Sequence, residues 1–164
     1  MSTDPEVDDL ADGRDETPNE RADRNWDELM QELRVMQTGT QILTGFLLAV
    51  AFQQRFTEMD AAQHVLYIAL VALAAVATLL SLTPVGMHRA LFGRRRKPEL
   101  VRIAARIVTL DLFVIGLLTV GVTTLIVDFT VGRSAGALTL VCSVALVGAL
   151  WAGLWRMLAA RRAG

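Results

Sequence analysis

The sequence predicts an all-α integral membrane protein, a four-helix bundle built from two transmembrane hairpins and preceded by a disordered acidic tail. Hydrophobic residues make up 53% of the 164 residues and charged residues 20%. The mean hydropathy of +0.43 exceeds that of ordinary soluble domains. Long apolar segments recur four times, and a strongly basic segment, residues 87–106, separates the second from the third. Together these features favour four helices that cross a lipid bilayer.

The N-terminal residues 1–24 contain nine acids and three bases and no aromatic residue, which predicts a disordered tail. A docking or regulatory role for this tail is the alternative. It lacks the apolar centre of a secretory signal peptide. From Asn25, which can cap a helix with Glu28 as its capping-box acid, the pattern predicts an amphipathic interfacial helix over 25–34. Trp26 suits the level of the lipid headgroups.

The membrane domain, residues 25–164, contains four predicted spans, each close to the length that a helix needs to cross a hydrocarbon core. We expect Pro84 to kink or end the second span near its inner face. Ala145, Ala149 and Gly153 repeat every four residues and predict a helix-packing face on the fourth. The spans are predicted at about 35–54, 65–87, 103–129 and 134–155.

Orientation follows from the distribution of arginine and lysine. With four spans, the tail, the central basic segment and the C-terminus share one side of the membrane. The other side carries only Arg55 and Arg133. Because cytoplasmic loops are enriched in Lys and Arg, both termini are predicted to lie in the cytoplasm, at the inner membrane of a cell.

The basic segment is predicted to be a cytoplasmic loop that attracts anionic lipid headgroups. A specific lipid or protein site is the alternative, and nucleic acid is not expected because aromatic residues are nearly absent from the segment. It contains Arg89, Arg94, Arg95, Arg96, Lys97, Arg102 and Arg106.

A polar stripe marks the first span. Arg34, Gln37, Gln41 and Thr44 fall on one helical face, which lipid cannot satisfy, so we expect the stripe to face other helices or a wet cavity. Asp111 is the one charge within the apolar body of the third span. We expect Asp111 to pair with Arg34; a protonatable site on a path for H+ or Na+ and snorkelling to the surface are the alternatives.

Few residues point to chemistry. Cys142 is the single cysteine, and the two histidines, His64 and His88, fall on opposite sides of the predicted membrane. No Gly-rich phosphate loop or nucleophile elbow is present in the sequence. The sequence therefore predicts no catalytic residue, no metal site and no cofactor. Asp128 is expected at a solvated helix end, paired with Arg133.

Two stretches carry a resemblance. NWDELMQELRVMQTGTQILTGFLLAVAFQQRF at 25–56 and HRALFGRRRKPELVRIAAR at 88–106 resemble a family of small bacterial four-span membrane proteins classed as a domain of unknown function. The pattern E-L-R-V-x-Q-T-G-x-Q in the first stretch is unusual at a membrane entry. Members of that family are sometimes labelled sodium:proton antiporter. The resemblance implies a membrane protein and supplies no site residues.

Two functions remain open from the sequence. The first is a non-enzymatic bundle that works through helix packing and its basic loop, interacts with a partner or with lipid, and forms a homo-oligomer. The second is a small ion- or proton-coupled transporter, which needs at least a dimer because four spans are few for a translocation path. Its first span offers Gln and Thr but no acid.

Overall fold

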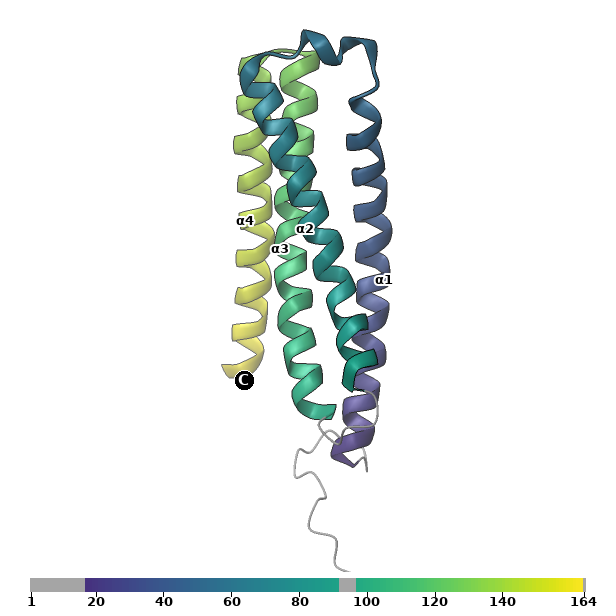
Figure 1. Ribbon diagram of the computed structural model, residues 1–164. Helices are drawn as coiled ribbons and strands as arrows, with labels where there is room; N and C mark the ends of the chain where they lie inside the picture. The colour runs from purple at the N-terminus through teal and green to yellow at the C-terminus, as the bar shows by residue number, and fades with distance from the viewer. Residues whose placement is uncertain (1–16, 92–96, 164) are drawn as a thin grey trace, which may run out of the picture. The chain divides into compact units, whose positions relative to one another are not determined.

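A computed structural model describes residues 17–91 and 97–163 of the chain. Within those residues the protein is all-α, with four long helices, one short 3-10 helix and no strand (Figure 1). The predicted all-α class is therefore confirmed for the described part of the chain. The elements are α1 (Pro18–Val50), η1 (Gln54–Glu58), α2 (Ala61–Leu91), α3 (Lys97–Thr130) and α4 (Arg133–Ala163).

Helix α1 begins at Pro18 rather than at Asn25, so the predicted end of the tail at residue 24 is wrong. Thr17 and Glu20 form a capping box. The Thr17 hydroxyl accepts a hydrogen bond from the Glu20 backbone N–H (3.3 Å), and the Glu20 carboxylate accepts one from the Thr17 backbone N–H (2.9 Å). The bonds that the carboxylate accepts from the Thr17 backbone N–H and from the Thr17 hydroxyl hold the pKa of Glu20 below its usual value. Proline at the first helical position completes the start signal. The remainder of the predicted tail, residues 1–16, lies outside the described residues.

The predicted interfacial helix and first span form one continuous helix, which ends at Val50 and not at Gln54. Three helices in the described part of the chain are long and apolar enough to cross a membrane, over residues 61–87, 99–130 and 133–153. Helix α1 is not among them, because its early end and the polar residues Gln37 and Gln41 lower its hydropathy. Three of the four predicted spans thus correspond to helices that have the length and composition to cross a membrane, and the first predicted span does not.

Contacts between helices divide the described residues into two units. The first unit holds α1 up to Gln41 together with the described residues of Val76–Phe113. The second unit holds Ile42–Ala75 and the described residues from Val114 onward. Each unit draws on α1, α2 and α3, and α4 belongs to the second.

The second unit has a hydrophobic core. The Tyr67 hydroxyl lies within it and donates a hydrogen bond to the Leu47 backbone oxygen at 3.0 Å, which ties α2 to α1. A Cβ atom on Gly121 would lie 2.3 Å from Cδ2 of Leu70, so the leucine side chain, which packs directly against this glycine, would have to shift. This hydrophobic core consists of Leu47, Tyr67, Leu70, Ala74, Leu118, Val122 and Leu125.

The first unit buries small, apolar and polar side chains together. Helix α2 continues through Pro84 to Leu91, so this buried proline does not end the helix. The buried apolar residues are small or aliphatic, which allows the helices to lie close. Among the buried residues of this unit are Leu33, Thr40, Ala77, Ser81, Leu100, Ala104, Val108 and Asp111.

Candidate functional site

A buried polar pair joins α2 to α3 within the first unit. Asp111 is 0% exposed and Ser81 is 1% exposed. The Ser81 hydroxyl donates a short hydrogen bond to Oδ2 of Asp111. A hydrogen bond to a carboxylate is stronger than one between neutral groups, so this contact fixes the register of the two helices.

The second oxygen of the same carboxyl group is buried without a partner. Oδ1 of Asp111 makes no hydrogen bond to any described residue. A buried ionised carboxylate needs compensation for its lost hydration, and one serine supplies only part of it. The carboxyl group of Asp111 is therefore chemically able to take up a proton.

The predicted pairing of Arg34 with Asp111 is wrong. Arg34 is exposed, and the partner of Asp111 is Ser81. The reason lies in the rotation of α1, whose buried face is Leu33, Thr40 and Leu47, each seven residues from the next. Since successive residues of a helix are about 100° apart, the position after Leu33 turns away from that face.

The predicted polar stripe is split by the same rotation. Gln41, like Arg34, is exposed, whereas Gln37 is half-buried. Thr44 is also half-buried, but it belongs to the second unit, and its buried hydroxyl has no partner among the described residues. Arg34, Gln37, Gln41 and Asp111 thus share the first unit, and Thr44 does not.

Ser81 and Thr40 were not singled out in the sequence. Thr40 is 2% exposed, and its hydroxyl donates to the Met36 backbone oxygen at 3.0 Å. A signal for Ser81 was present, because Ser81 and Asp111 lie on either side of the α2–α3 connection at comparable sequence distances. In an antiparallel helical pair such residues meet at similar depth.

A second polar cluster lies where α3 meets α4, in the second unit. Asp128 accepts hydrogen bonds from the Gln63 side-chain amide and from Nη1 of Arg133, the latter at 3.2 Å. The predicted pairing of Asp128 with Arg133 is confirmed, although the side chain of Asp128 is only 10% exposed. Nη2 of Arg133 also pairs with the Asp60 carboxylate. The cluster links the start of α2 to the α3–α4 turn.

Asp60 gives this cluster a pH dependence. The Gln63 backbone N–H (2.9 Å) and the charge of Arg133 hold the pKa of Asp60 below its usual value, although desolvation opposes them. A depressed folded-state pKa stabilises the fold above the ordinary aspartate pKa, and this stabilisation is lost as the pH falls through the folded value. We expect the midpoint temperature of thermal unfolding in detergent to be independent of pH near neutrality and to fall below about pH 4. Asp60→Asn should remove part of that acid-induced shift, and an unchanged acid-induced shift in Asp60→Asn would contradict the assignment.

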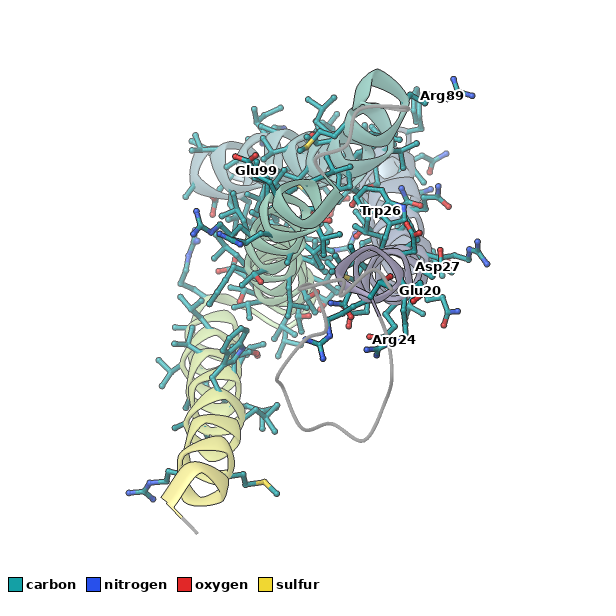
Figure 2. The ribbon with its side chains drawn as sticks, turned by 90° about the horizontal axis from the view of Figure 1, so that it is seen from below. Glu20, Arg24, Trp26, Asp27, Arg89 and Glu99 are labelled. Carbon is teal, nitrogen blue, oxygen red and sulfur yellow. The ribbon has the colours of Figure 1, made fainter. Side chains whose placement is uncertain are left out.

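The basic segment is mostly helical rather than a loop. Helix α2 extends to Leu91 and α3 begins at Lys97, which leaves Arg94, Arg95 and Arg96 outside the described residues. Figure 2 shows Arg89 projecting outward from α2, with Glu20, Arg24 and Asp27 around the first turns of α1. Arg89, Arg102 and Arg106 are exposed.

A family model matches residues 15–155, which include both predicted hairpins and the capping box at the start of α1. The chain belongs to DUF6328, a family of unknown function. The DUF6328 match covers the two stretches, 25–56 and 88–106, on which the resemblance to a family of unknown function was based. No curated protein and no solved structure matches this DUF6328 chain.

Proposed function

We propose that this DUF6328 protein is an integral protein of the bacterial plasma membrane with four spans and both termini in the cytoplasm. It acts without catalysis, through helix packing and through the basic residues that flank the α2–α3 connection. Helix α1 supplies the first of these spans, in addition to α2, α3 and α4, and its polar residues are shared between the helix contacts and the protein surface.

The observation that carries this proposal is that apolar side chains lie on the surface while polar side chains are buried, the opposite of the arrangement in a soluble protein. Large apolar side chains are exposed on every long helix, while Asp111, Ser81 and Thr40 are buried. Helix α4 is the extreme case, since only 6% of its apolar stretch is buried. Monomeric soluble proteins rarely expose contiguous apolar surface on that scale, whereas lipid covers it readily.

The basic residues support the orientation and a role at the headgroups. Arg89, Arg102 and Arg106 are exposed at the ends of α2 and α3 that join through residues 92–96. Each basic residue near an anionic leaflet contributes about 1 kcal/mol of attraction. These charges hold that end of the protein at the cytoplasmic leaflet.

Membrane extraction and reporter fusions test this proposal. We expect the full chain to remain with the membrane after a carbonate wash and to need detergent for release. A reporter active only in the cytoplasm should work after Gly164, and one active only outside should work when inserted next to Thr57 in the exposed η1. A chain that purifies as a soluble monomer without detergent, or a C-terminal reporter active only outside, would refute it.

The second candidate function is an oligomeric ion- or proton-coupled transporter, similar to a sodium:proton antiporter. The observation that favours it is the buried Oδ1 of Asp111, which has no partner among the described residues. In proteoliposomes, a sodium- or pH-driven flux should then be abolished by Asp111→Asn and retained by Gln41→Leu, because Gln41 lies on the exposed side of α1. Absence of flux in folded wild-type protein would eliminate this candidate.

A further inference from the structure

A cavity of about 410 Å³ lies in the second unit, between the end of α1, η1 and the end of α3. Its volume falls in the range of small-molecule sites. Most of the lining is aliphatic or aromatic, and polar side chains gather where η1 contributes to the wall. The apolar lining includes Phe46, Val50, Val122, Leu125, Ile126 and Phe129.

One side of the cavity faces the outside of the helices. Phe46 is 68% exposed and Ile126 is 51% exposed, yet both line the cavity. In the proposed bilayer these two residues face the lipid chains. A lipid chain can therefore enter sideways without leaving the apolar phase.

Arg55 lies at the polar end of the cavity, and only one of its three guanidinium nitrogens is used in a hydrogen bond within the described part of the chain. Its Nε donates to Glu58 at 3.0 Å, and its guanidinium carbon lies 4.9 Å from the centroid of the Phe129 ring. Nη1 and Nη2 make no hydrogen bond to any described residue, and the side chain is 62% exposed. The ion pair and the cation–π contact pre-orient a guanidinium fork that matches a phosphate group.

We propose that this cavity binds an anionic glycerophospholipid, with one acyl chain between α1 and α3 and the phosphate on Arg55. The inference rests on the proposed membrane location. An apolar slot beside a cation at the level of a span's end has the polarity of a phospholipid, whose phosphate adjoins its acyl chains. Glu58 lies beside the phosphate position and weakens the attraction for a negative charge.

Quenching of a local fluorophore by brominated lipids can measure whether the cavity prefers an anionic phospholipid to a zwitterionic one. The reporter is Phe129→Trp in a chain whose Trp26, Trp151 and Trp155 are replaced by phenylalanine. A second reporter, Leu140→Trp, lies on the exposed side of α4 and outside the cavity lining, and serves as the control. Both proteins are reconstituted in phosphatidylcholine with increasing dibrominated phosphatidylglycerol or dibrominated phosphatidylcholine, with helical content checked by circular dichroism.

We expect phosphatidylglycerol to quench the cavity reporter more strongly than phosphatidylcholine, by up to about fivefold, the effect of one basic residue near an anionic lipid. Glu58 offsets part of that effect. The control reporter should be quenched equally by the two lipids. Arg55→Gln should abolish the preference, and Glu58→Gln should increase it. Opposite changes at two exposed residues cannot both result from misfolding.

Equal quenching by the two lipids at the cavity reporter, or a preference that survives Arg55→Gln, would overturn the inference and leave the membrane location intact. Absence of quenching by either lipid at both reporters would instead refute the membrane location itself.

Discussion

Ser81→Ala should destabilise the protein by about 1–3 kcal/mol, because it leaves the fully buried carboxyl group of Asp111 without its hydrogen-bond donor. The double variant Ser81→Ala/Asp111→Leu should recover most of that loss, since leucine has a branched shape similar to that of aspartate and needs no partner. The free energy of unfolding in mixed micelles, titrated with a denaturing detergent, measures both effects.

The matched control is Thr109→Val on α3. Its hydroxyl is exposed and donates only to the Ala105 backbone oxygen, so its loss should change stability little. If Ser81→Ala proved as mild as Thr109→Val, the pair would contribute little to the packing of α2 on α3. If the double variant were less stable than Ser81→Ala alone, the carboxyl group would have a stabilising role beyond the serine contact.

Gly136→Ala should separate the first turns of α4 from α3, at a cost of about 1–3 kcal/mol. A Cβ atom at this position would lie 2.6 Å from the Asp128 Cβ and 2.9 Å from its Cα. Neither atom is the end of a flexible side chain, so the backbones must move apart. The movement would also strain the hydrogen bonds that Asp128 accepts from Gln63 and Arg133.

Gly153→Ala provides the comparison, because a Cβ atom there meets nothing within 4 Å. We expect it to be neutral or slightly stabilising, since alanine favours helix over glycine by up to about 1 kcal/mol. Equal effects of Gly136→Ala and Gly153→Ala would show that the close approach at Gly136 does not form. The same unfolding titration reports on both.

The long helices could be predicted from the sequence because apolar length is a property of each segment alone. Helices α2, α3 and α4 were anticipated in this way, with ends displaced by between one and eight residues. The start of α1 was missed since two capping boxes compete there. Thr17 with Glu20 and Asn25 with Glu28 have equivalent spacing, and the choice between them depends on whether the residues from Pro18 to Arg24 continue the helix.

The site was harder to predict because it depends on helix rotation. The sequence placed Arg34, Gln37 and Gln41 on one face, but that face could turn toward or away from Asp111. Packing of Leu33, Thr40 and Leu47 turns Arg34 outward, and this choice reflects contacts with other helices. Ser81 went unnoticed because a single serine in an apolar span forms no repeating pattern, and the only signal was its sequence distance from the α2–α3 connection, which is comparable to that of Asp111. The Asp128–Arg133 pair was predictable because the two residues are close in sequence across a tight turn.

The attachment of α4 has a consequence for how the protein is assembled. Three features hold its first turns: Gly132 adopts a φ of 131° at the turn, Arg133 pairs with two carboxylates, and Gly136 lies against the backbone of Asp128. None of the seven side chains in the hydrophobic core of the second unit comes from α4. A chain that terminated at Thr130 would keep every side chain of that core, so we expect deletion of α4 to leave the packing of the preceding helices largely intact.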